Sequence, residues 1–134
     1  NNRVHTRQVS SPVGRPLKGF GTYTNLLQAL RDAIAGHRYM YETHQVLHRN
    51  ISKNNILLNP SGNSPDRSTG GSPSRGGFLI DFDMAVSYPR TEVSGAAHRT
   101  GTFDFMTLGV LLPYSMQAHS PLHDLESFFY VLLF

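Results

Sequence analysis

Two polar motifs, each attached to a short apolar run, constrain this chain more than any other feature. The first is the run 48–58 (HRNISKNNILL), in which Asn50 and Asn55 are five residues apart. The second is the run 78–83 (FLIDFD), in which Asp81 directly follows three apolar residues. Apolar runs this short, bounded by polar residues, predict brief strands that flank polar loops. Amide and carboxylate side chains are therefore expected on neighbouring loops.

A helical period begins at Thr24 and continues to Tyr41. Apolar positions recur at steps of three and four residues, with polar and charged residues on the opposite side. The apolar side holds Leu26, Leu27, Leu30, Ala33, Ile34, His37 and Tyr41. This pattern predicts the longest helix of the chain. Residues 3–20 before it are predicted to be extended, because Pro12 and Pro16 prevent a continuing helix.

Short strands are predicted at 46–47, 56–58 and 78–80, where brief apolar runs occur. Residues 59–77 contain no apolar side chain of the kind that builds a core, so burial cannot offset the entropy of ordering them. They are predicted to form a flexible insertion. Residues 83–107 are polar and rich in turn-forming residues, and a loose loop is expected there.

The C-terminal run 124–134 (DLESFFYVLLF) is apolar nearly all round, which predicts a helix buried on every side. Ser120 and Pro121 suit the cap and the first turn of that helix. A helix without its neighbours would leave a large apolar face in water. The chain is therefore expected to be a fragment or a truncated gene product.

Length and composition exclude several classes of protein. At 134 residues the chain can hold one domain, but it is short for an enzyme that clamps a nucleotide between two lobes. The absence of cysteine excludes a disulfide framework and favours an intracellular, cytoplasmic location. No apolar run approaches the ~20 residues of a membrane span. The 12 Lys and Arg residues are scattered, so neither a nucleic acid nor a membrane is expected as a partner.

The two polar motifs suit phosphoryl transfer. Magnesium prefers hard oxygen ligands, which the Asp81 carboxylate and the Asn55 amide would supply from facing loops. The reaction also needs a group that orients the attacking hydroxyl, and Asn50 stands where such a group is expected. Lys53 is a candidate for neutralising the transferring phosphate. These four residues are the predicted catalytic set, with Asn55 and Asp81 as its metal ligands.

The run 48–58 is similar to the H-R-D-x-x-x-x-N loop of protein kinases, with Asn50 in place of the aspartate. Residues 79–83 are similar to the D-F-G segment, with Asp83 in place of the glycine. The chain resembles the fungal-type protein kinase family over nearly its whole length. Further matches lie at 13–17 (after the hinge), 26–37 (the long helix), 100–102, 105–106 and 123–129.

The resemblance implies an α+β fold, the core of a kinase-like C-terminal lobe, mainly helical with short strands and incomplete. Residues 1–134 would be a partial domain, from a hinge-proximal segment through long helix, catalytic loop and activation segment to the start of a buried helix. The implied activity is ATP-dependent phosphorylation of protein serine or threonine, with ATP and magnesium as cofactors. Leu57 would lie beneath the adenine, and Thr102 would face the substrate hydroxyl.

The resemblance also implies structural roles. His48 and Phe82 would stack in the apolar spine that links the two lobes, and Asp124 would hold the catalytic-loop backbone through hydrogen bonds. One departure is the run 107–109 (TLG), which stands where kinases read A-P-E, so the anchoring glutamate is absent. The glycine-rich loop, the strand lysine and the helix glutamate of a kinase are expected before Asn1.

Asparagine at position 50 keeps the shape of aspartate, but it cannot take a proton. General-base catalysis contributes ~10²–10⁴-fold, so the loss is severe without being absolute. Because the glycine-rich loop, the strand lysine and the helix glutamate are also expected outside residues 1–134, a larger deficit than Asn50, this chain alone is expected not to catalyse. The alternative is a pseudokinase or interaction module with weak or no nucleotide binding. Drift in a decayed gene copy would leave the same residue.

Other interpretations are weaker. Asp81 and Asp83, two apart on a predicted strand, are similar to the D-x-D of aspartyl-phosphate hydrolases, but that interpretation leaves Asn50 and Asn55 unexplained. His119 and His123 have the spacing of a metal-binding pair, although a helix start between them is the better explanation. His37 and the aromatic run 128–130 are interpreted as core residues.

Overall fold

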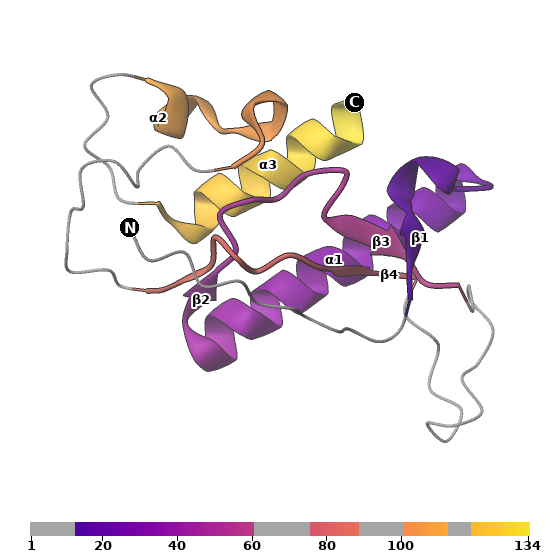
Figure 1. Ribbon diagram of the computed structural model, residues 1–134, viewed down its shortest axis with the longest axis horizontal. Coiled ribbons are helices and arrows are strands. Elements are labelled where there is room, and N and C mark those ends of the chain that lie inside the picture. Colours follow the sequence, from indigo (N-terminus) through magenta and orange to yellow (C-terminus); the bar gives the residue numbers. More distant parts are fainter. Residues whose placement is uncertain (1–12, 61–75, 89–100, 113–118) are drawn as a thin grey trace, which may run out of the picture.

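The computed structural model describes residues 13–60, 76–88, 101–112 and 119–134 (Figure 1). This part of the chain has an α+β architecture with three α-helices and short antiparallel strands. The elements in chain order are β1 (Arg15–Pro16), α1 (Tyr23–His44), β2 (Val46–Leu47), β3 (Ile56–Leu58), β4 (Gly77–Leu79), β5 (Val86–Ser87), α2 (Leu108–Leu111) and α3 (Pro121–Leu133).

The predicted long helix is confirmed as α1, which extends a few residues beyond the predicted end. It begins after Thr22, whose Oγ1 accepts a hydrogen bond from the Asn25 N–H at 3.2 Å. It ends at Gln45, which has a left-handed φ of 53° and donates its N–H to the Tyr41 carbonyl. The residues buried on its inner side are Ala29, Leu30, Ala33 and His37.

A three-stranded antiparallel sheet, in the order β1-β3-β4, lies along α1 (Figure 1). Strand β4 approaches the helix closely, because a Cβ added to Gly77 would lie 2.7 Å from the Ala29 Cβ. On β3, Ile56 and Leu58 are buried, whereas Leu57 is half-buried. The predicted strands are confirmed, and β4 begins and ends one residue earlier than predicted. Strand β1 lies in the stretch predicted to be extended, but the 3-10 turn Leu17–Gly19 that follows does not.

A second, two-stranded ladder pairs β2 with β5 in antiparallel register. Val86 pairs with Leu47, and Ser87 pairs with Val46. The prediction of a loose loop from residue 83 is therefore wrong for 86–87, whose pairing depends on a partner strand about forty residues earlier. Residues 61–75 of the predicted insertion lie outside the described residues, and Gly77 at its predicted end belongs to β4.

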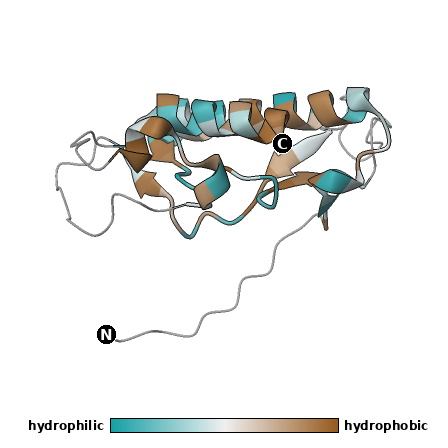
Figure 2. Cartoon of the chain, turned by 90° about the horizontal axis from the view of Figure 1, so that it is seen from above, coloured by the Kyte–Doolittle hydropathy of each residue, from teal (hydrophilic) through white to brown (hydrophobic). Residues whose placement is uncertain are grey.

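The core lies between α1, the three-stranded sheet and one side of α3. Its buried members are Leu17, Ala29, Leu30, Ala33, Ile51, Ile56, Leu58, Phe105, Phe128 and Val131. Figure 2 shows brown and teal segments along the same helical ribbon, as expected for helices that are buried on one side. None of the helices in the described part of the chain is long and apolar enough to cross a membrane.

Helix α3 buries one side only, so the prediction of a helix buried all round is wrong for this chain. Phe128 and Val131 face α1 and the turn Phe103–Phe105, which cover that side. Other apolar side chains of the helix are exposed, namely Leu122, Leu125, Phe129, Leu132 and Leu133. The predicted helix start is confirmed, with Ser120 at the N-cap and Pro121 as the first residue.

Candidate functional site

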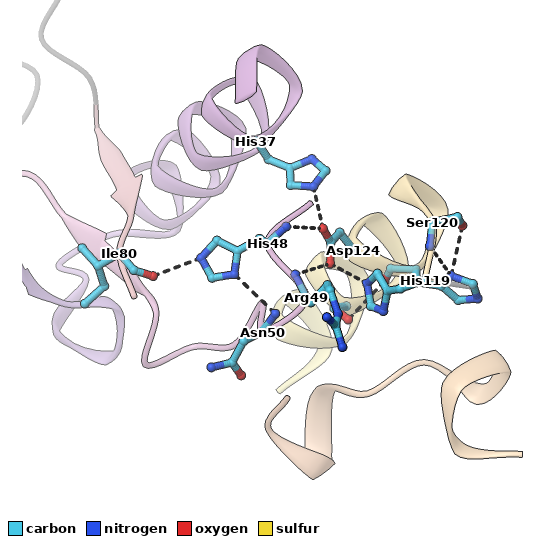
Figure 3. Close-up of polar contacts among 10 residues, drawn as sticks. His37, His48, Arg49, Asn50, Ile80, His119, Ser120 and Asp124 are labelled. Carbon is cyan, nitrogen blue, oxygen red and sulfur yellow. Dashed lines mark hydrogen bonds and ion pairs between the residues drawn. The ribbon is translucent and has the colours of Figure 1, made fainter. Parts of the chain in front are cut away.

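A single buried carboxylate holds the start of the loop after β2. Asp124, on the first turn of α3, accepts hydrogen bonds from the backbone N–H groups of His48 at 2.9 Å and Arg49 at 3.0 Å. Two histidine side chains contact the same carboxylate through Nε2, His37 at 2.8 Å and His119 at 2.9 Å (Figure 3). The prediction that Asp124 holds this backbone is confirmed.

The contacts keep Asp124 ionised. Burial alone would raise the pKa of its carboxyl group, but hydrogen bonds from His119 and His37 outweigh burial and hold that pKa well below its usual range. Arg49 takes a left-handed φ of 65°, a conformation that costs about 1–2 kcal/mol for a residue with a side chain. The hydrogen bond from its N–H to the charged carboxylate offsets this cost.

His48 connects the loop to the end of β4. Its Nε2 lies 3.0 Å from the Ile80 carbonyl oxygen, and its Nδ1 accepts the Asn50 N–H at 3.3 Å (Figure 3). This pattern requires the neutral ring with the proton on Nε2, and burial lowers the pKa of His48 in the same direction. The His48 and Phe82 ring centroids are 4.7 Å apart. Their predicted contact is confirmed, whereas their role between two lobes stays a prediction.

Asn50 joins three other residues of the site. Its Oδ1 accepts hydrogen bonds from the Thr102 N–H at 3.0 Å and from the Thr102 hydroxyl at 3.1 Å. Its Nδ2 lies 3.5 Å from Asp81 Oδ2, and its backbone carbonyl accepts the Asn55 Nδ2 at 2.8 Å. Three predicted site residues therefore lie around one point. Thr102, predicted to face a substrate hydroxyl, contacts the side chain expected to orient that hydroxyl.

The donor set around Asn50 fits magnesium bound together with phosphates. Because Asn55 uses Nδ2 to contact Asn50, its amide oxygen is the branch left for a cation. Asp81 is exposed and has a left-handed φ of 65°. Among the residues described, no cluster of three or more His, Cys, Asp or Glu side chains suits a metal ion. One carboxylate and one amide match the way Mg²⁺ is held when a nucleotide supplies the other ligands.

The chain matches the profile of the family described as "Fungal protein kinase" over residues 1–134. It belongs to the fungal protein kinase family. A search of curated proteins finds no match. Membership of the fungal protein kinase family confirms the resemblance seen in the sequence, and it implies kinase-like function and the use of ATP and magnesium in general terms.

Two predicted residues of the fungal protein kinase site lie apart from this cluster. Lys53 places its Nζ 3.3 Å from the centre of the Phe134 ring, and no contact within the described ranges joins it to Asn50 or Asp81. Leu57 lies on the face of β3 opposite its buried neighbours, where a Cβ on Gly14 would come within 2.5 Å of the Leu57 Cβ. The assigned roles of Lys53 and Leu57 stay predictions.

A cavity of about 10 Å³ borders Asn50 and Thr102. Its lining includes the buried Thr107, and also His119, whose Nε2 contacts Asp124. A cavity of this volume accommodates about one water molecule. It is therefore far too small for a nucleotide.

Gly109 stands where the resemblance places the glutamate of the kinase A-P-E segment, and the space beside it is filled. A Cβ added to Gly109 would lie 2.8 Å from His123 Nε2. His123 Nδ1 accepts the Ser120 N–H at 2.9 Å at the start of α3. His123 thus caps the helix together with Ser120, which the sequence predicted as the cap, and His119 binds Asp124. The alternative of a metal-binding histidine pair is not supported.

The D-x-D interpretation is wrong in its geometry. Strand β4 ends at Leu79, and Asp81 follows in a left-handed conformation. Asp83 lies in the turn after it, so the two carboxylates do not share one face of a strand. The sequence also did not predict the contacts of His119 with Asp124 and of Thr102 with Asn50. The sequence offered only one indication of these two contacts, namely that polar residues occur near the catalytic-loop motif and near the cap of α3.

Proposed function

We propose that this chain is the catalytic-loop core of the C-terminal lobe of an ATP-dependent protein serine/threonine kinase domain, with phosphoryl transfer slowed by Asn50. The observation that carries the proposal is the convergence of Asn55 and Asp81 on Asn50, in a loop whose backbone is held by Asp124. Family membership supports the same reaction class. The partner would be a protein substrate inside the cell, consistent with the absence of cysteine.

Each residue has a separate role in this proposal. Asn55 and Asp81 would hold magnesium, which would supply positive charge to stabilise the transferring phosphoryl group. Leu57 supports the adenine ring from the outer face of β3. Lys53 stands three residues after Asn50 and would have to leave the Phe134 ring to reach a phosphate.

Asn50 orients the substrate hydroxyl but does not remove its proton. The amide oxygen accepts hydrogen bonds at any pH, whereas an aspartate would also accept the proton. In a loose transition state the hydroxyl loses its proton late, so orientation retains part of the rate enhancement. The expected enzyme is therefore slow rather than inert, provided that the rest of the phosphate-binding groups are supplied by the full-length protein.

One observation favours a second candidate, a pseudokinase or interaction module. Thr102 donates two hydrogen bonds to Asn50 Oδ1, the same atom that a substrate hydroxyl would need. A carbonyl oxygen has two lone pairs, so both are used by Thr102. A protein that keeps this contact would bind partners through its surface and show weak or no nucleotide binding.

The test is the restoration of the base in the full-length protein. Asn50→Asp is expected to raise kcat for phosphorylation of a generic protein substrate by about 10²–10⁴-fold. Adding Asp81→Asn to that variant is the control, and it should abolish the gain because the metal ligand is lost. No gain from Asn50→Asp, together with no thermal shift by ATP and magnesium, would favour the interaction module.

A further inference from the structure

The orientation of the Asn50 amide is fixed by its partners. Thr102 offers two donors, its N–H and its hydroxyl, at 3.0 and 3.1 Å from the same Asn50 atom, so that atom must be the carbonyl oxygen. The amide nitrogen then faces Asp81 Oδ2 at 3.5 Å. Asn50 therefore presents a negative dipole end to two donors and a positive end to a carboxylate.

A carboxylate at position 50 would satisfy Thr102 equally well, but it would place a second negative oxygen beside Asp81. Like charges this close repel strongly unless a cation lies between them. The asparagine removes this repulsion and replaces it with a weak attraction. The same substitution lowers the negative charge available to a divalent cation, and cation affinity depends on the charge of the ligands.

We propose that the Asn50 amide takes the place of a divalent cation between the catalytic loop and Asp81. The amide holds the loop and Asp81 in contact without Mg²⁺, and the site binds Mg²⁺ weakly. The magnesium part rests on the proposed function, because it assumes that Asp81 and Asn55 are the ligands. The part that concerns the contact of Asn50 with Asp81 without Mg²⁺ rests on the hydrogen bonds alone. Through the Asn50 side chain, Asp81, two residues after β4, is connected to Thr102, the residue before the turn Phe103–Phe105.

The experiment measures thermal and urea unfolding of the full-length protein without nucleotide, in EDTA and in excess MgCl₂. Sodium chloride at matched ionic strength controls for screening of surface charges. The wild type is expected to show the same Tm in both conditions. Asn50→Asp should lower the Tm in EDTA and regain it in Mg²⁺. At Mg²⁺ about 100 times its Kd, the unfolding constant of that variant should fall about 100-fold.

Two further variants separate charge repulsion from a general loss of stability. Asn50→Ala removes the amide without adding a charge, so its Tm should fall equally in EDTA and in Mg²⁺. The double variant Asn50→Asp with Asp81→Asn exchanges carboxylate and amide, and it should recover a Tm near that of the wild type in EDTA with no response to Mg²⁺.

The proposal is overturned if Asn50→Asp is as stable as the wild type in EDTA, or if the wild type responds to Mg²⁺ as strongly as Asn50→Asp does. Failure of the proposed function gives a different result. In that case Asn50→Asp shows the magnesium-dependent stability described above, but no phosphorylated product appears in the kinase assay.

Discussion

His37 Nε2 and Asp124 Oδ2 lie 2.8 Å apart, and they join the buried side of α1 to the first turn of α3 across 87 positions of sequence. The two residues are 4% and 1% exposed. The same carboxylate binds the backbone N–H groups of His48 and Arg49. The packing of the two helices and the shape of the loop between β2 and β3 therefore depend on one side chain.

Asp124→Asn should destabilise the protein by about 3 kcal/mol. The amide keeps one acceptor oxygen, but its NH₂ group would face donors that now contact the second carboxylate oxygen, and buried donors would lose their partner. Urea unfolding measures the change. Asp104→Asn, at an exposed position, is the matched control and should change the unfolding free energy by less than about 0.5 kcal/mol. Equal effects of the two variants would contradict the central role of Asp124.

Stability should fall on mild acidification. Burial lowers the pKa of His48, and burial also lowers that of His123. The unfolded chain therefore binds protons on these rings below about pH 6.5, where the folded chain does not. Since the unfolded state holds more protons, the free energy of unfolding rises with pH in this window and falls as pH drops below about 6.5. Each ring contributes at most about 1.4 kcal/mol per pH unit.

Urea unfolding at a series of pH values between 7.5 and 5 measures this slope. His48→Phe keeps an aromatic ring beside Phe82 and removes the titrating group. The slope of its unfolding free energy against pH should therefore be smaller, by an amount that corresponds to at most one bound proton. An unchanged slope in that variant would mean that His48 is already protonated in the folded protein, against its hydrogen bond from the Asn50 N–H.

A second loss of stability should follow in stronger acid. The pKa of Asp124 lies below its usual range, despite burial, because of its hydrogen bonds from His119 and His37. Such a group stabilises the folded state above its unfolded pKa of about 3.9, and this contribution is lost as pH falls through the lower folded value. The loss should therefore begin near pH 4. Asp124→Asn should lack this phase in acid unfolding followed by circular dichroism, and its presence in the variant would assign it to another carboxylate.

The elements with a clear local pattern were predictable. Helix α1 follows from a long 3.6-residue period with Thr22 before it, and β3 follows from three apolar residues after a polar loop. Strand β5 was not predictable, because Val86 and Ser87 have little strand pattern of their own and pair with β2. The one-sided burial of α3 was missed because hydrophobicity reports what a helix can bury, not what covers it.

The candidate site, like the fold, has a part that the sequence predicted and a part that it did not. Asn50, Asn55 and Asp81 were predicted to meet because two sequence motifs place them on facing loops, and in the structure Asn55 and Asp81 both contact Asn50. Contacts that cross the fold could not be read from spacing. Thr102 reaches Asn50 from 52 positions away, and His119 reaches Asp124 from the residue before the N-cap of α3.

Asp81→Asn should weaken the binding of ATP with magnesium to the full-length protein by tenfold or more, because it removes the only charged ligand proposed for the cation. Asp83→Asn is the matched control, since it removes an exposed carboxylate two residues later that has no place in the proposed site. Isothermal titration with ATP in MgCl₂ measures both. Equal losses of affinity in the two variants would indicate that both Asp81 and Asp83 bind the cation, and would contradict the assignment of Asp81 alone.

Gly77→Ala should destabilise the protein by about 1–3 kcal/mol. The added Cβ would lie 2.7 Å from the Ala29 Cβ and 2.9 Å from the Leu57 carbonyl oxygen, so β4 would have to move away from α1. Gly36→Ala is the matched control, because a Cβ there meets nothing within 4 Å on α1. It should stabilise the helix by up to about 1 kcal/mol. Opposite signs in urea unfolding would support the close contact between β4 and α1, whereas two stabilising changes would mean that the strand lies farther from the helix.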